Sequence, residues 1–330
     1  MSKSIFNIEN EEEYLQDKEN VDINEKNARG QNALFSSSLE KTKWLIKNGI
    51  NINLVDIHGN NVLVFCDVEK AEILINEGVD FNHKNGRGSS LLFSEKDPKK
   101  IELFIKKGVN INLINLDGEN ALTYAFYNEN TEEAIKNFTC KILNYIKAGI
   151  DINHTNCKNE NFLFSSYINY EIILELLKKG ININQLNTNN ENALFNSYIT
   201  PEIASALIIA GIDVSQHNES GQNALWYADV NVCEILIDAG IDINSYDEDG
   251  INALRYADIE KTNYLIDKGI DLSVYTSDFF DKLEETIIYE IEECFPYEKI
   301  ALIKARKENN ELKKSLKSID DVSLFNKKRI

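Results

Sequence analysis

A glycine recurs through most of this chain at a nearly constant spacing, and each copy closes a similar segment. The strings that follow alternate apolar residues with Asn or Asp, as in ININ after Gly49 and IDIN after Gly240. Successive copies are 29, 30, 41, 31, 31, 29 and 29 residues apart, counted along Gly49, Gly78, Gly108, Gly149, Gly180, Gly211, Gly240 and Gly269. This period predicts an array of eight repeats, each of which buries its apolar face against its neighbours.

Each repeat is expected to form two short helices. The segment GQNALWYADVNVCEILIDAGIDIN from Gly221 aligns without a gap with GINALRYADIEKTNYLIDKGIDL from Gly250. The Asn of the NAL string is placed to cap the first helix by accepting a backbone N–H bond, and we expect the Ala–Leu pair to face inward. The capping positions are Asn32, Asn61, Asn120, Asn161, Asn192, Asn223 and Asn252, with Ser90 in the third repeat.

The second helix carries apolar residues ten, seven, four and three places before the closing glycine. In the seventh repeat these are Val230, Cys233, Leu236 and Ile237. This spacing predicts one apolar stripe along a helix. The glycine is then expected to end the helix in the left-handed conformation.

The repeat explains fourteen of the fifteen glycines. Six of them lie two residues before a capping position, where Asn159 and Asn190 stand in the fifth and sixth repeats, so we expect a left-handed backbone there too. Only Gly86 is left over. The NGRG string at Asn85 is therefore interpreted as a turn rather than a phosphate-binding loop.

These motifs resemble the ankyrin repeat, whose unit reads roughly G-x-TPLH-x-A, a helix, then LL-xx-GADVN. NALF is similar to TPLH, and GIDIN is similar to GADVN, over about residues 20 to 275. The resemblance implies an all-α solenoid of about eight helix-turn-helix units with helical caps at both ends. Ankyrin units run to about 33 residues, and most repeats here are shorter between NALF and the second helix. We therefore predict a first helix of little more than one turn.

Three segments are predicted: an N-terminal cap over residues 1–20, the array over 21–275 and a helical extension over 276–330. The string EEEYLQDKEN resembles the second half of a repeat, which favours a capping helix. In the extension, FFDKLEETIIYEIEEC has the spacing of a capping helix, and YEKIALIKARKENNELKKSLKS reads as a charged helix that packs on it or makes a separate contact. The long fourth repeat predicts two full helices and an extended loop around Asn128–Phe138, either as a simple insertion or as a protrusion that shapes the binding face.

Motifs for chemistry are missing from the sequence. The five cysteines are scattered without CxxC spacing, which argues against disulfides and a zinc site. The four histidines, His58, His83, His154 and His217, lie in turns of different repeats, too far apart for one metal ion. We expect no metal, no cofactor and no enzyme activity, and an enzyme within the tail is the weakest interpretation. Without a long apolar run or a signal pattern, we expect a cytoplasmic protein.

The net charge of −19 disfavours nucleic acid and anionic membranes as partners. It favours a basic protein partner, and we expect a monomer when unbound. The charge is uneven, because no Lys or Arg stands between Lys179 and Arg255. That stretch holds eleven acids: Glu191, Glu202, Asp213, Glu219, Asp229, Glu234, Asp238, Asp242, Asp247, Glu248 and Asp249.

The resemblance implies that the turns and first helices form a concave recognition surface. Two sets of candidate partner-binding residues follow. Apolar clusters in two turns, where water-facing residues should be polar, suggest an interface or packing between turns: Val55, Ile57, Ile114 and Leu116. Aromatic and charged residues combine in the acidic stretch as either a binding face or a solvated surface: His217, Glu219, Trp226, Tyr227, Asp229, Tyr246, Asp247, Glu248, Asp249 and Tyr256.

The leading hypothesis is a non-catalytic protein-interaction module whose acidic face binds a basic partner. One version is an immunity or antitoxin-like protein that covers a toxin. The composition, rich in Asn, Ile, Lys and Glu, resembles that of proteins from AT-rich bacterial or viral genomes. The alternative is a host-directed effector or viral adaptor, in which the repeats bind the target and residues 277–330 recruit other machinery.

Overall fold

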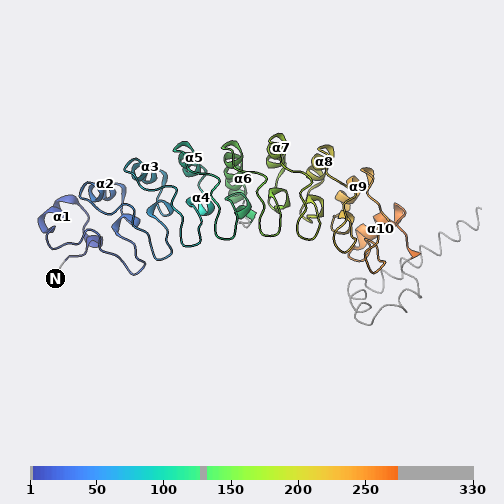
Figure 1. Cartoon of the computed structure of the whole chain (residues 1–330), viewed down its shortest axis with the longest axis horizontal. Helices are drawn as coiled ribbons and strands as arrows, with labels where there is room; N and C mark the ends of the chain where they lie inside the picture. The colour runs from blue at the N-terminus through green and yellow to red at the C-terminus, as the bar shows by residue number, and fades with distance from the viewer. Residues whose placement is uncertain (1–2, 127–131, 274–330) are drawn as a thin grey trace, which may run out of the picture. The chain divides into compact units, whose positions relative to one another are not determined.

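The computed structural model describes residues 3–126 and 132–273. Helices joined by turns make up this part of the chain, and it contains no strand (Figure 1). The chain divides into two compact units, Met1–Gln185 and Leu186–Ile330, called here the N-terminal and the C-terminal unit. In each unit the longer helices lie along one side and the turns project from the other (Figure 1).

Each repeat has a short first helix and a longer second helix. The N-terminal unit contains η1 (Ile5–Asn7), α1 (Glu11–Asp17), η2 (Ala33–Phe35), α2 (Leu39–Lys47), η3 (Val62–Val64), α3 (Val68–Asn76), α4 (Leu91–Ser94), α5 (Pro98–Lys106), η4 (Thr123–Phe126), α6 (Glu132–Lys147), η5 (Phe162–Phe164) and α7 (Tyr170–Lys178). The C-terminal unit contains η6 (Ala193–Phe195), α8 (Pro201–Ile209), η7 (Ala224–Trp226), α9 (Val230–Asp238) and α10 (Ile259–Asp267). The prediction of a first helix of about one turn is confirmed.

The capping asparagine explains why the first helix can be so short. In the first repeat, the Oδ1 of Asn32 accepts the N–H of Leu34 at 3.2 Å, and its Nδ2 donates to the carbonyl of Asn51 at 2.8 Å. The same pair of bonds forms at Asn61, Asn120, Asn161, Asn192, Asn223 and Asn252. Each buried asparagine thus ties the start of its repeat to the string that ends it, which compensates for the few backbone bonds of a short helix.

Neighbouring repeats are joined by a second asparagine, which is the last residue of a string such as the ININ or IDIN that follows a closing glycine. Its Oδ1 accepts a backbone N–H from the next repeat over distances of 2.6 to 3.1 Å. These acceptors are Asn24, Asn53, Asn82, Asn112 and Asn153 in the N-terminal unit and Asn244 in the C-terminal unit. Repeats therefore stack through polar bonds as well as through the apolar core.

The buried stripe of the second helix differs from the predicted one. In α9 the buried residues are Val232, Cys233 and Leu236, whereas Val230 and Ile237 are only half-buried. The sequence pattern missed the position eight residues before the glycine, because five repeats place a lysine there. These are Lys41, Lys70, Lys100, Lys141 and Lys261, and all five are buried.

The buried lysines link each second helix to other backbone groups. The ammonium of Lys70 donates to the carbonyls of Leu34 and Ser37, and that of Lys261 donates to the carbonyls of Trp226 and Ala228. Lys100 instead pairs with Glu95 at 2.7 Å. Such donors satisfy carbonyls at the end of a short helix that have no partner within it.

The fourth repeat departs from the predicted loop. Its second helix, α6, has 16 residues against nine in α5 and α7. Residues 132–138 are therefore helical, and the extra length extends the outer helix. The remainder of the predicted loop, 128–131, lies outside the described residues, as do residue 127 and residues 274–330 with the predicted C-terminal helices.

Two non-glycine residues confirm the predicted turn geometry. Asn159 has a φ of 60° and Asn190 a φ of 63°, in the left-handed region that glycine occupies at the equivalent position of the other repeats. Among the described residues, no helix is long and apolar enough to cross a membrane.

Candidate binding surfaces on the turns

Every turn between repeats is held by one side chain at its first position. In the turn Asn85–Gly88, the Oδ1 of Asn85 accepts the N–H groups of Arg87 and Ser89, both at 3.0 Å. The equivalent residues are Asn27, Asp56, Asn115, Asn156, Asn187, Asn218 and Asp247. This Asx geometry fixes the backbone of the turn and leaves the second and third side chains free to vary.

Adjacent turns are also joined backbone to backbone. The N–H at the second position donates to the carbonyl at the third position of the preceding turn, as from Gly86 to His58 at 2.9 Å and from Glu248 to Ser220 at 3.0 Å. The other bonds of this kind run from Ile57 to Arg29, from Leu116 to Arg87 and from Glu219 to Asn189. These bonds join the first four turns of the N-terminal unit and the three turns of the C-terminal unit, and the surface made by the turns of each unit is called here the turn face.

The turn face of the C-terminal unit is acidic. Glu219 and Glu248 occupy the same position in successive turns, and both are exposed. From residue 186 to residue 273 the unit has fifteen carboxylates and three basic side chains. Of the three basic groups, Arg255 pairs with carboxylates of the face, and Glu219 and Glu248 have no ion pair with any of the three. Lys261 is buried against carbonyls, Arg255 is buried and paired with Asp247 and Asp249, and Lys268 lies over the Tyr264 ring. Glu219 and Glu248 thus keep their charge without an ion pair in the described part of the unit.

Most of the acidic candidates are on the surface. Exposed residues of the predicted set are His217, Glu219, Tyr227, Asp229, Tyr246, Glu248, Asp249 and Tyr256. Asp229 is not on the turn face, because it caps α9 by accepting the N–H of Val232 at 2.8 Å. Asp249 is partly neutralised by Arg255 at 3.2 Å.

Two candidates are structural rather than exposed. Trp226 is only 3% exposed because it belongs to the inward face of η7, and its ring packs edge-on against Tyr256. Asp247 is buried because its carboxylate accepts the N–H groups of Asp249 and Ile251, as the first residue of its turn. Burial raises the pKa of Asp247. Both residues therefore support the face from the interior, and neither is a candidate for direct contact with a partner.

The half-exposed tyrosines beside this face are fixed by hydrogen bonds. The Tyr227 hydroxyl donates to Oε1 of Gln222 at 2.6 Å and accepts from Nδ2 of Asn218 at 3.1 Å. The Tyr246 hydroxyl donates to Asp271 at 2.8 Å. Held side chains lose little conformational entropy on binding, which suits an interface anchor.

The apolar candidates of the N-terminal unit are exposed. Ile57 and Leu116 occupy the second position of their turns and are 66% and 78% exposed. Val55 and Ile114 lie two residues earlier in the chain and are also exposed. If these side chains packed against neighbouring turns, they would be largely buried. Their exposure therefore favours an interface over packing between turns.

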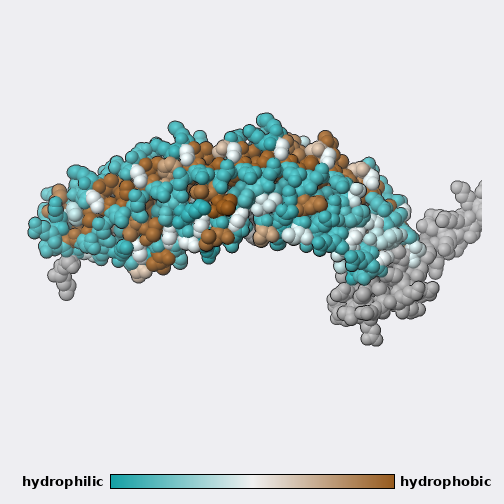
Figure 2. Space-filling view, viewed as in Figure 1, coloured by the Kyte–Doolittle hydropathy of each residue, from teal (hydrophilic) through white to brown (hydrophobic). Residues whose placement is uncertain are grey.

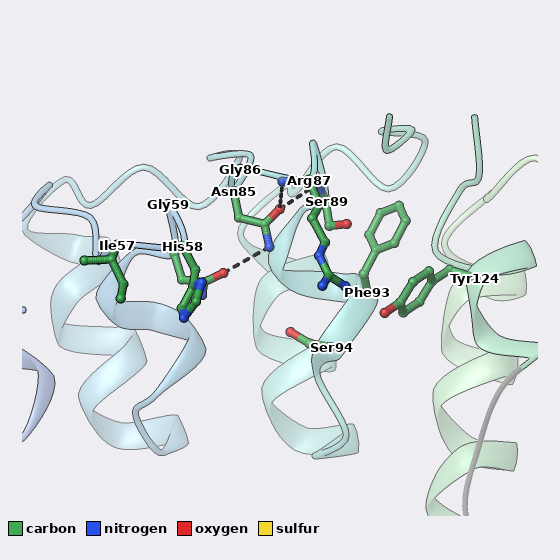
Figure 3. A pocket seen from close by; sticks show the side chains of 11 residues that line it. Ile57, His58, Gly59, Asn85, Gly86, Arg87, Ser89, Phe93, Ser94 and Tyr124 are labelled. Carbon is green, nitrogen blue, oxygen red and sulfur yellow. Dashed lines mark hydrogen bonds between the residues drawn. The ribbon is translucent and has the colours of Figure 1, made fainter. Parts of the chain in front are cut away.

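Sequence reasoning missed a hollow beside these apolar residues. A cavity of about 480 Å³ is lined by Ile57, His58, Gly59, Asn60, Asn85, Gly86, Arg87, Ser89, Phe93, Ser94 and Tyr124 (Figure 3). Its residues come from two turns and from the first helices of the third and fourth repeats. Gly86, the one glycine that the repeat does not explain, could have indicated this hollow. It occupies the second position of its turn, where the neighbouring turns carry Ile57 and Leu116, and its missing side chain leaves space.

Three of the four histidines join neighbouring repeats. Nε2 of His83 lies 2.7 Å from the carbonyl of Gly59, and Nε2 of His154 lies 2.6 Å from that of Gly118. His217 meets the Ser245 hydroxyl at 2.9 Å. No group of His, Cys, Asp and Glu among the described residues has the arrangement of a metal site.

Comparison with known proteins reports on the fold. No protein-family model matches the sequence, and no curated protein matches it. Among solved structures the chain is similar to the human ASB11 ankyrin repeat domain, with a TM-score of 0.51 and 18% sequence identity. The match covers 61% of this chain and 93% of that one. The fold is therefore an all-α ankyrin-repeat solenoid.

Proposed function

We propose that the chain is a non-catalytic protein-binding module, and that the acidic turn face of the C-terminal unit binds a basic protein. The observation that carries this proposal is the state of the three basic side chains. Because Lys261 is buried against carbonyls and Arg255 engages Asp247 and Asp249, the exposed carboxylates of Glu219 and Glu248 keep an uncompensated charge. Such a charge attracts an oppositely charged surface and accelerates its capture.

The face combines charge with anchors of fixed position. Glu219 and Glu248 provide charge at equivalent places of successive turns, and Tyr227, Tyr246 and Tyr256 provide partly exposed rings nearby in the repeat. Aromatic side chains of this kind supply most of the energy in many interfaces, whereas charges mainly set specificity and association rate. A basic, compact protein such as a nuclease toxin fits this chemistry, which is the immunity version of the proposal.

The test compares two charge-reversed variants with the same net charge. The first, Glu219→Lys with Glu248→Lys, alters the turn face. The control, Glu234→Lys with Glu260→Lys, alters exposed residues of α9 and α10. Proteins captured from the source cell are identified, purified and titrated against all three forms at low and high salt.

We expect a captured partner with a basic surface, bound more weakly at high salt because salt screens exposed charges. The turn variant should lose about tenfold or more in affinity, which is at least 1.4 kcal/mol. The control variant should bind like the unchanged chain. A partner that binds the turn variant with unchanged affinity would remove the acidic face from the function.

A further inference from the structure

The first three turns of the N-terminal unit have the opposite charge. Residues 24–31, 53–60 and 82–89 contain four basic side chains, whereas the fourth turn holds Asp117 and Glu119: the four are Lys26, Arg29, Lys84 and Arg87. His58 occupies the same third position as Arg29 and Arg87. All five of these side chains belong to exposed residues. A cationic surface of this kind is unexpected in a chain of net charge −19.

The two carboxylates within these turns do not cancel that charge at the surface. Asp56 is buried and accepts the N–H groups of His58 and Asn60 at 2.9 Å. Glu25 is turned toward the chain start, where Ser4 Oγ donates to it at 2.7 Å and the Ile5 N–H at 3.1 Å. Both carboxylates serve the fold, so the exposed groups of the three turns are predominantly cationic.

Apolar surface adjoins the cations in the hollow of Figure 3. The rings of Phe93 and Tyr124 lie 5.2 Å apart and form one wall, and the Arg87 side chain extends along the same hollow (Figure 3). His58 and Ile57 form the opposite side. The second-position residue between them is Gly86, and a Cβ there would lie 3.0 Å from the His58 carbonyl oxygen. Brown apolar residues are visible among teal ones on this part of the molecule (Figure 2).

We propose that this hollow and the three cationic turns bind an acidic peptide segment of a partner protein. A Glu or Asp carboxylate of the segment pairs with the Arg87 guanidinium, which can bind it through two N–H bonds, and further carboxylates meet Arg29 and Lys84. An aromatic or aliphatic side chain of the segment enters the hollow against Tyr124 and Ile57. The combination of charge and an apolar hollow specifies a ligand class opposite to that of the C-terminal unit.

The same surface suits nucleic acid poorly. Binding to a phosphate backbone depends on many basic contacts that displace counterions, and these turns offer only four Lys or Arg side chains. The exposed apolar residues Ile57 and Leu116 would gain nothing from a phosphate chain. An acidic, apolar-anchored peptide uses both properties of the surface.

The experiment presents a random peptide library to the full chain and to two variants. Arg87→Glu changes the hollow, and Lys106→Glu makes the same charge change at an exposed site on α5 that does not line it. Binding of the enriched peptides is then measured by titration, and circular dichroism checks that each variant is folded. Arg87→Gln and Tyr124→Ala serve as milder second variants, since neither side chain is part of the buried core.

We expect selected peptides rich in Asp and Glu with one aromatic or aliphatic residue. Their affinity should fall about tenfold or more in Arg87→Glu and several-fold in Tyr124→Ala, and stay unchanged in Lys106→Glu. Enriched peptides without acidic residues, or equal binding to the Arg87 variants, would overturn the proposal. Tighter binding of a single-stranded oligonucleotide that Arg87→Glu abolishes would also overturn it, in favour of nucleic acid.

Two controls distinguish a peptide bound in the hollow from a second copy of the chain and from a ligand of the C-terminal unit. A dimer of the chain that Arg87→Glu dissociates, seen by light scattering, would overturn the proposal, because the occupant would be a second copy and not a partner's peptide. Acidic peptides that bind equally well to the Glu219→Lys, Glu248→Lys variant would support it, since their site then lies outside the C-terminal turn face. The two surfaces can therefore succeed or fail independently.

Discussion

The side-chain amide of Asn223 donates to the backbone carbonyl of Asp242 at 2.7 Å, across the whole length of its repeat. The same side chain accepts the N–H of Leu225 at 3.1 Å, so one buried residue satisfies both ends of the repeat. An interaction of this kind is costly to lose, because truncation leaves buried polar backbone groups without a partner.

Asn223→Ala should therefore destabilise the protein by about 1–3 kcal/mol. The matched control is Asn231→Ala, at an exposed position of α9, where a change within about 0.5 kcal/mol is expected. Urea unfolding followed by circular dichroism measures both variants. Equal stabilities for the two variants would mean that the two hydrogen bonds of the Asn223 side chain contribute nothing to folding.

The third repeat offers the reverse experiment. Ser90 makes no capping bond, and its hydroxyl is buried without a partner in the described structure. Ser90→Asn restores the residue of the other seven repeats and should raise stability by about 1 kcal/mol. A rise in the unfolding midpoint, with an unchanged dependence on denaturant, would support this role of the cap, and a fall would show that the site lacks room for the amide.

Lys141 should make stability depend on alkaline pH. Burial lowers its pKa from 10.5 to about 8 in the folded chain, although its ammonium donates to the carbonyl of Glu95 at 2.8 Å. Between these two values the unfolded chain binds more protons than the folded chain, so stability from this group rises with pH. The folded state carries the cost of charging Lys141 below about pH 8, and that cost is relieved as pH approaches 10.5.

The comparison for this prediction is Lys141→Met at several pH values. The stability of the unchanged chain relative to the variant should increase from pH 7.5 to 10.5, by about 1–3 kcal/mol. Lys106→Met, at an exposed position of α5, should show no such trend. A difference that stays constant with pH would contradict the lowered pKa.

Trp226 and Tyr256 should separate stability from binding. Trp226 is buried and Tyr256 is exposed, although their rings pack at 6.1 Å. Trp226→Ala is expected to cost about 3–5 kcal/mol in folding. Tyr256→Ala should cost only about 1 kcal/mol, and any larger effect should be on partner affinity. A binding defect confined to Trp226→Ala, in a variant of normal stability, would return Trp226 to the contact surface.

The repeat, its capping asparagine and its short first helix follow from the sequence because they depend on local chemistry. Asn223 caps in the way its place before Ala–Leu predicts, and Asn190 adopts the conformation that its alignment with glycine indicates. The buried stripe could be predicted only in part, because a lysine such as Lys261 is expected to be exposed. Its burial depends on the carbonyl groups to which its ammonium donates. Those partners lie more than thirty residues away in the chain.

The candidate surfaces are harder to predict for the same reason. Asp247 and Glu248 are adjacent and equally acidic in the sequence, yet one is buried beneath the turn and the other is exposed. Only the bonds that Asp247 accepts distinguish them. The hollow beside Arg87 combines residues from separate repeats, so no single motif encodes it.

The backbone bonds that join adjacent turns have a consequence for how this protein can change. Because Glu248 and Ile57 hold their neighbours through main-chain atoms, the side chains at those positions are not needed for the stack. Mutation can replace them one at a time with little effect on the folded framework. Related proteins can therefore keep binding a rapidly evolving partner by substitutions in the turns, while the stacked helices beneath them stay the same.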